Sequence, residues 1–169
     1  IKFSPCICKR QDMIVQAKKT ILSQGIKDYE EFAAKVVEPE LNRTFYGETA
    51  PISDKWVPEA LAVSGFTREQ HLKFPKPEET MPKFVQWLKS LGADRLIFVS
   101  DNIIFDGMWC FYYLHTFAGE NPFGFSGRRL GDIYSGLTKS AFTQNDWKKM
   151  YRKTKHDHNP KTMLLQTRK

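Results

Sequence analysis

An amide and a carboxylate, Asn102 and Asp106, stand four residues apart directly after the most apolar stretch of the chain. Residues 96–99 have the composition of a buried strand, and a helix that begins at Asn102 would place both side chains on one face of its first turns. Asp106 is surrounded in sequence by Ile, Phe, Met and Trp, and a buried carboxylate is costly unless it is paired or binds a metal. At the carboxyl end of a strand, such a carboxylate suits a hard cation such as Mg²⁺. The alternative is an ordinary first-turn acid that interacts favourably with the helix dipole.

A second group of candidate residues is the basic C-terminal end. The net charge of +7 equals the excess carried by residues 148–169, in which eight Lys and Arg stand against one acid, Asp157. Aromatic and histidine side chains are interleaved with these cations, a pattern that suits a phosphate backbone and base stacking. A solvated terminus without a partner is the alternative. Farther upstream, Arg128 and Arg129 either contact phosphate or face solvent.

The elements that would position these residues are those of a mixed α/β domain. Strands are predicted at residues 43–49 and 96–99, and the second is expected in the interior of a sheet. Residues 28–38 are ambiguous between helix and strand; as a strand, FAAKVV would form a hairpin with RTFYGET. A helix over 102–117 is apolar nearly all round, so it is expected to be buried.

Further helices are predicted from the spacing of apolar residues and from Gly at their ends. They cover residues 12–24, where the pattern is loose; 58–63, before Ser64 and Gly65; 78–91, before Gly92; and 146–155, which is basic. Residues 128–134 are consistent with a short strand or with the start of a helix.

Composition limits the class of protein. A chain of 169 residues with 41% hydrophobic and 14% aromatic residues is expected to fold as one domain. No apolar run approaches the roughly 20 residues that cross a bilayer, and the N-terminus lacks the order of a signal peptide. The chain begins with Ile, which is expected of a fragment or a processed form. Cys6, Cys8 and Cys110 are too few and scattered for a disulfide framework, which favours an intracellular, cytoplasmic protein over a secreted one.

The N-x-x-F-D pattern of Asn102, Phe105 and Asp106 resembles the second motif of the DEDD superfamily of 3′–5′ exonucleases, of the DEDDh type that includes RNase T. Two further stretches agree in order and rough spacing. ALAVSGFT (60–67) resembles a segment that follows the early hairpin, and HDHNP (156–160) resembles the start of the third motif. The resemblance implies an RNase H-like α/β fold with a mixed central sheet flanked by helices.

The chemistry of this superfamily uses two metal ions. Four acids bind two Mg²⁺ or Mn²⁺ ions about 4 Å apart, which clamp the attacking and leaving oxygens of a phosphodiester. A histidine takes the proton from the attacking water. The resemblance implies that Asp106 is a metal ligand and that His158 is the general base, with His156 as the alternative base.

The resemblance also implies a substrate-binding set. Ser64, Gly65 and Phe66 would border the terminal nucleotide, with Gly65 allowing a close approach and Phe66 able to stack on a base. Asn102 would contact the substrate beside the metal ligand. Phe105 is expected to be mostly core packing.

Two of the acidic motifs of the superfamily are not evident. The superfamily opens with Asp-x-Glu at the end of its first strand, whereas the only Asp-x-Glu of this chain, at residues 28–30, follows no apolar strand and is interpreted as first-turn helix acids. The last acid should stand about five residues after the histidine. Met163 stands five residues after His158, and Lys161 stands five residues after His156.

These observations predict an N-terminal segment of uncertain structure (1–32), an exonuclease-like domain (33–160) and a basic tail (161–169). The predicted function is 3′–5′ hydrolysis of RNA or single-stranded nucleic acid with Mg²⁺ or Mn²⁺, impaired by the incomplete ligand set. The alternative is a catalytically inactive module that binds nucleic acid and keeps the exonuclease fold. RNA or single-stranded DNA is the expected partner, a membrane is not, and a homodimer is left open.

Overall fold

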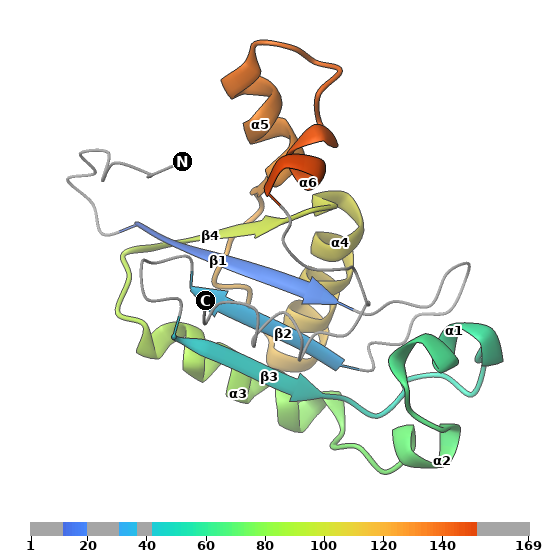
Figure 1. Ribbon diagram of the computed structural model, residues 1–169. Coiled ribbons are helices and arrows are strands. Elements are labelled where there is room, and N and C mark those ends of the chain that lie inside the picture. The colour runs from blue at the N-terminus through green and yellow to red at the C-terminus, as the bar shows by residue number, and fades with distance from the viewer. Residues whose placement is uncertain (1–11, 20–30, 37–41, 152–169) are drawn as a thin grey trace.

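A five-stranded mixed sheet forms the centre of the computed structural model, which describes residues 12–19, 31–36 and 42–151 (Figure 1). The strands are β1 (Asp12–Lys19), β2 (Glu31–Val36), β3 (Thr44–Glu48), β4 (Arg95–Ser100) and β5 (Gly127–Arg129). Their order across the sheet is β3-β2-β1-β4-β5. β2 is antiparallel to β1 and β3, whereas β4 is parallel to β1 and β5.

The central strand β1 corrects the helix predicted at residues 12–24. Residues 12–19 pair on one side with β2 and on the other with β4, in a register that places Gln16 beside Val99. The loose helical spacing competes here with a run of β-branched residues, Ile14 and Val15, that favours a strand. Two partner strands then decide the conformation, because residues 15–19 pair with β2 and residues 12–16 pair with β4. The sheet therefore begins N-terminal to residue 33.

The predicted hairpin is confirmed. The ambiguous segment 28–38 contains strand β2, which pairs antiparallel with β3 so that Ala34 lies opposite Phe45. Ala34 is also opposite Ala17 of β1 and is completely buried. A small residue at this interior position leaves room for the helices that cover the sheet.

Six α-helices and one π-helical turn complete the described part of the chain. They are α1 (Pro58–Ser64), α2 (Arg68–His71), α3 (Pro77–Ser90), α4 (Ile103–Tyr113), η1 (Leu114–Ala118), α5 (Leu130–Thr138) and α6 (Asp146–Tyr151). The predicted helices at 58–63 and 78–91 are confirmed as α1 and α3. Each is followed by a glycine at positive φ, Gly65 at 81° and Gly92 at 67°, where other residues are strained. Among the described residues, no helix is long and apolar enough to span a bilayer.

The core lies between the sheet and the helices α3 and α4, which both lie behind the sheet in Figure 1. Phe84 and Leu88 of α3 are buried together with Phe98 of β4 and Tyr113 of α4. The Phe84 ring lies 5.1 Å from the ring of Phe45, which ties α3 to β3. Each such side chain contributes roughly 1.5–3 kcal/mol by burial, so this cluster anchors α4 against β4.

The helix predicted at 102–117 is present, but the expectation that it is buried all round is wrong. Gly107, Cys110 and Tyr113 face the core, whereas Ile104, Met108 and Tyr112, spaced four residues apart, are exposed. A helix packed on one side of a sheet hides only one face, and the apolar residues on the other face stay in solvent. Phe105, expected mostly in the core, is 37% exposed for the same reason.

The topology brings four strand ends together. β3 runs in the same direction as β1, because β2 is antiparallel to both, and β4 and β5 also run parallel to β1. The carboxyl ends of β1, β3, β4 and β5 therefore lie along one side of the sheet, which we call the carboxyl edge.

Residues 128–134, predicted as strand or helix start, contain both: β5 ends at Arg129 and α5 begins at Leu130.

Candidate nucleic-acid interface

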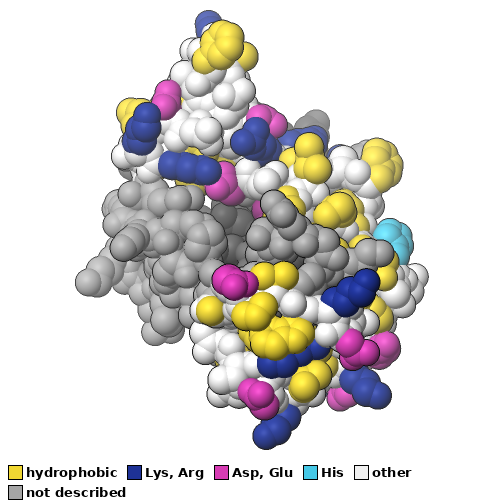
Figure 2. All heavy atoms as spheres, turned by 90° about the vertical axis from the view of Figure 1, so that its right-hand side faces the viewer, with side chains coloured by type: hydrophobic (Ala, Val, Ile, Leu, Met, Phe, Trp, Pro, Cys, Tyr) yellow, Lys and Arg dark blue, Asp and Glu magenta, His cyan; other side chains and the backbone are white. Residues whose placement is uncertain are grey.

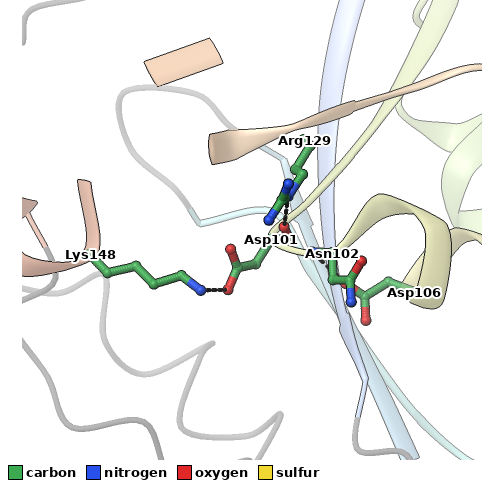
Figure 3. Close-up of polar contacts among 5 residues, drawn as sticks. All are labelled: Asp101, Asn102, Asp106, Arg129 and Lys148. Atoms are coloured by element: carbon green, nitrogen blue, oxygen red, sulfur yellow. Dashed lines mark hydrogen bonds and ion pairs between the residues drawn. The ribbon is translucent and has the colours of Figure 1, made fainter. Parts of the chain in front are cut away.

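Asn102 and Asp106 lie at the carboxyl edge, where β4 passes into α4 (Figure 3). Asn102 precedes the first residue of the helix and is exposed, and Asp106 is half-buried in its first turn. The carboxylate Oδ2 of Asp106 accepts a hydrogen bond of 3.3 Å from the backbone N–H of Asn102, while the Asp106 N–H donates to the Asn102 carbonyl at 2.8 Å. Asp106 thus closes the first turn of α4.

Asp101, beside them, is held by two cations from distant segments. Its carboxylate Oδ2 lies 2.8 Å from Nζ of Lys148 in α6, and its carbonyl accepts a hydrogen bond of 3.1 Å from Nε of Arg129 in β5. The side chains of all three residues are about one third exposed. Arg129 also lies 3.6 Å from Asp132 in α5. The end of β4 is therefore bordered by a lysine and an arginine that face solvent in part.

A close approach of backbones makes this arrangement possible. A Cβ placed on Gly127, the first residue of β5, would lie 2.4 Å from Cδ1 of Ile103 and 3.1 Å from the carbonyl oxygen of Phe98. Only glycine lets β5 lie this close to β4 and to the start of α4. The close fit brings Arg129, two residues later, within reach of Asp101.

The substrate-binding residues expected after β3 lie in the α1–α2 segment. Ser64 is buried, and its hydroxyl donates to the Leu61 carbonyl at 2.7 Å and accepts from the Phe66 N–H at 3.3 Å. Gly65 is exposed, with open space where a Cβ would stand. Phe66 is half-buried, and its ring lies edge-on to Phe74 at 4.9 Å. Ser64 therefore serves the turn between α1 and α2, and Gly65 is the accessible member of this set.

A buried histidine stabilises the same segment. His71 is 1% exposed, and burial, followed by the positive charge of Arg68, lowers its pKa from 6.5 to about 4. Its ring lies 5.7 Å from that of Phe74. At neutral pH His71 is uncharged and acts as part of the packing under α2.

Several predicted site residues lie outside the described part of the chain. His156 and His158, the two candidates for the general base, are among them, as are the acids at residues 28–30 and the end of the basic helix predicted at 146–155. Of that predicted helix, residues 146–151 are confirmed as α6.

The acids that the described residues bring to the carboxyl edge do not fit a two-metal site. Within these residues no three His, Cys, Asp or Glu side chains lie close enough to hold a metal ion together. Asp101 is engaged by Lys148, and the sequence of β1 ends without the Asp-x-Glu that the superfamily carries at the end of its first strand. A lysine repels a cation, whereas a two-metal clamp needs several carboxylates.

The sequence indicated Asn102, Asp106 and Arg129, but the pairing of Asp101 with Lys148 was not predicted. Lys148 is one of many cations near the C-terminus, and no feature of the neighbouring sequence distinguishes it from the others.

Figure 2 views the carboxyl edge face-on and shows Lys and Arg side chains, mixed with Asp and Glu, around the base of the projection formed by α5 and α6. Apolar side chains gather on the lower part of the same face.

Comparisons with known proteins agree with this fold. No protein-family model matches the chain. The chain is 29% identical over 106 residues to the 3′–5′ DNA exonuclease Cap18 of Escherichia coli, a match that covers 61% of this chain and 57% of the relative. It thus spans little more than half the length of that curated relative.

Two solved structures are similar over most of the chain. Cell-death related nuclease 4 superposes with a TM-score of 0.66 at 14% identity, covering 93% of this chain and 64% of that one. A 3′-exonuclease described as recognising the 3′ end of a histone mRNA stem-loop superposes with a TM-score of 0.64 at 15% identity, covering 95% and 63%. The chain therefore has the RNase H-like fold of the DEDD 3′–5′ exonuclease superfamily, which it also resembles in sequence.

Proposed function

We propose that this chain binds single-stranded nucleic acid along the carboxyl edge and does so without two-metal hydrolysis. The observation that supports this proposal is the charge of the edge. Lys148 and Arg129 border the end of β4, and the side chain of each is about one third exposed. Cations at this place attract a phosphodiester and repel the metal ions that would hydrolyse it.

The similar proteins support a nucleic-acid ligand of either kind. The curated relative is named a DNA exonuclease, and one similar structure is described with an mRNA stem-loop. A strand that follows the edge from α1 to α5 would pass the exposed amide of Asn102, which can accept and donate hydrogen bonds. Phosphate contacts of this kind hold a strand whatever its sequence.

Hydrolysis is the second candidate function, and one observation favours it. The relative that shares 29% identity is an exonuclease, and Asp106 stands where the N-x-x-F-D resemblance places a metal ligand. In that function, Asp106 would hold a divalent ion and either His158 or His156 would accept the proton from water. The acids still needed would have to come from residues outside the described ranges.

The test is binding of a fluorescent oligonucleotide, DNA or RNA, to the purified chain in EDTA. We expect binding without metal, and we expect Lys148→Ala to weaken it and to lower the log–log salt slope by about 0.7. Lys149→Ala is the matched control, because Lys149 is the next residue of α6, is 82% exposed and bridges to Asp146 instead. Its slope should match that of the unmodified chain.

Two results would contradict the proposal. Binding that disappears in EDTA and returns with Mg²⁺ would mean that a metal ion holds the strand. Equal losses for Lys148→Ala and Lys149→Ala would mean that the positive charge of α6 acts only at long range, without a contact at the carboxyl edge.

A further inference from the structure

An exposed tryptophan stands at the carboxyl edge, between the end of β3 and the start of α1. Trp56 is 41% exposed. A single exposed apolar residue is ordinary on a protein surface, so exposure alone assigns it no role. The neighbourhood of Trp56 distinguishes it, because a cation lies over its ring.

That cation is Arg68, in the first turn of α2. Its guanidinium carbon lies 5.8 Å from the centre of the Trp56 ring, and its Nη2 donates a hydrogen bond of 3.0 Å to the carbonyl of Ser53. A guanidinium over an indole is a favourable cation–π arrangement. Ser53 belongs to the same linker as Trp56, so Arg68 contacts this linker twice: through the hydrogen bond to Ser53 and through the Trp56 ring.

The supports of this pair are built into the backbone. The linker after β3 is tied to the start of α3 by the Ala50 N–H, which donates to the Pro75 carbonyl at 2.7 Å, and by the Thr80 hydroxyl, which donates to the Glu48 carbonyl at 2.8 Å. α2 begins with a capping box in which Thr67 and Gln70 bond to each other's backbone N–H. Arg68 is therefore placed by α2 and by its bond to Ser53, and its guanidinium lies over the Trp56 ring.

An aromatic ring fixed beside a guanidinium is suited to single-stranded nucleic acid. Bases stack on exposed aromatic rings whatever their sequence, and a neighbouring arginine neutralises the adjoining phosphate. Phe66, the aromatic residue that the resemblance suggests for stacking, already lies against Phe74 and is half-buried. Trp56 offers a larger and more open ring at the same edge.

We propose that Trp56, held by Arg68, is a base-stacking residue of this chain. The inference rests on the proposed function, since it names the part of the nucleic acid that the α1 side of the carboxyl edge contacts. Lys148 and Arg129 would then hold phosphates at one end of the strand, and Trp56 would hold a base toward the other.

The experiment pairs a protein change with a ligand change. Affinity is measured in EDTA for a short oligo-dT and for an abasic oligomer of equal length, which keeps the phosphates and lacks the bases. Trp56→Ala should weaken oligo-dT binding by about fivefold to a hundredfold and leave abasic binding unchanged. Trp56→Phe, which keeps a stacking ring, should recover most of the lost affinity.

Phe125→Ala is the matched control. Phe125 is 98% exposed and lines a cavity of about 440 Å³ that also includes Asp94 and Arg95 at the amino end of β4, opposite the carboxyl edge. Removing this exposed aromatic ring should leave the affinity for both oligomers unchanged.

The outcomes separate the inference from the proposed function. If the unmodified chain binds neither oligomer, the proposed function fails. If it binds both and Trp56→Ala binds oligo-dT as tightly as before, the stacking inference fails alone. Equal losses for oligo-dT and the abasic oligomer would assign Trp56 a structural role and overturn the inference. Circular-dichroism melts of each variant show whether the fold is retained.

Discussion

At the scale of single residues, the end of β4 is organised by Asp101. Its carboxylate binds Lys148 and its carbonyl binds Arg129, so one residue links α6 and β5 to the strand. All three side chains are partly exposed, and an exposed ion pair contributes roughly 0–1 kcal/mol to stability. Its main effect is on charge, because a paired Lys148 offers less net positive potential to a phosphate.

Replacing Asp101 tests this effect. We expect Asp101→Asn to tighten oligonucleotide binding by about two- to fivefold, because it removes a negative charge next to the phosphate path and releases Lys148. Fluorescence anisotropy at low salt measures the change. Glu120→Gln, which removes the acid of the Lys89–Glu120 ion pair, is the control and should have no effect. Weaker binding by Asp101→Asn would mean that the Asp101 carboxylate makes a favourable contact with the oligonucleotide.

The buried His71 makes a prediction about pH. The pKa of His71 is about 4 in the folded chain and 6.5 when unperturbed. As the pH falls from 6.5 toward 4, the imidazole therefore becomes protonated in the unfolded chain but stays neutral in the folded chain. Stability present above pH 6.5 is lost over that range, by roughly 2 kcal/mol from this group at pH 5.

Urea unfolding at pH 7 and pH 5 measures this loss. His71→Gln should flatten the pH dependence, although it lowers stability at both values, because a buried ring is lost. His115→Gln, which removes an exposed histidine, controls for the substitution. An unchanged pH dependence in His71→Gln would show that His71 titrates normally in the folded chain.

At the scale of elements, the site depends on how closely β5 approaches β4 and α4. Gly127→Ala would place a Cβ against Cδ1 of Ile103 and the Phe98 carbonyl. We expect a loss of about 1–3 kcal/mol in unfolding free energy, since a packed interior resists an added methyl. Arg129 would shift with β5, so oligonucleotide affinity should fall as well.

Two further variants show whether the cause is the contact. Gly136→Ala in α5 meets nothing within 4 Å and should be neutral or slightly stabilising, because alanine favours a helix. Ile103→Val combined with Gly127→Ala removes the nearest methyl and should restore part of the stability. A Gly127→Ala chain as stable as the original would mean that β5 adjusts at no cost.

At the scale of the whole molecule, the chain has the fold of an exonuclease, and within the described residues no three metal-ligating side chains lie together at its carboxyl edge. With Mg²⁺ or Mn²⁺ and a labelled oligonucleotide, we expect hydrolysis far below that of a four-acid exonuclease, and we expect Asp106→Ala to leave the residual rate unchanged. The reason is that ligands which act together lose nearly all their effect when one part is missing. Product gels over time measure both rates.

The opposite result is equally clear. Rapid 3′–5′ degradation that Asp106→Ala abolishes would establish hydrolysis as the function. The acids of residues 28–30 would then be the first candidates for the missing ligands, and their substitution to Asn and Gln would be the next measurement.

The sequence alone determined the features that depend on neighbours along the chain. The apolar run at 96–99, the glycines that end α1 and α3, and the four-residue spacing of Asn102 and Asp106 each follow from local geometry, and each is found in the structure. The sequence also predicted the hairpin of β2 and β3, because its two strands are close together in the chain.

Only the tertiary structure decided the features that join distant segments. β1 is a strand because β2 and β4 lie on either side of it, an arrangement that local helical spacing could not reveal. Lys148 meets Asp101 because the fold brings α6 to the carboxyl end of β4, and Arg68 meets Trp56 because α2 lies against the linker that precedes α1. The sequence specifies the charge and shape of each side chain. Which residue it contacts depends on burial and on strand pairing between segments that are far apart in the chain.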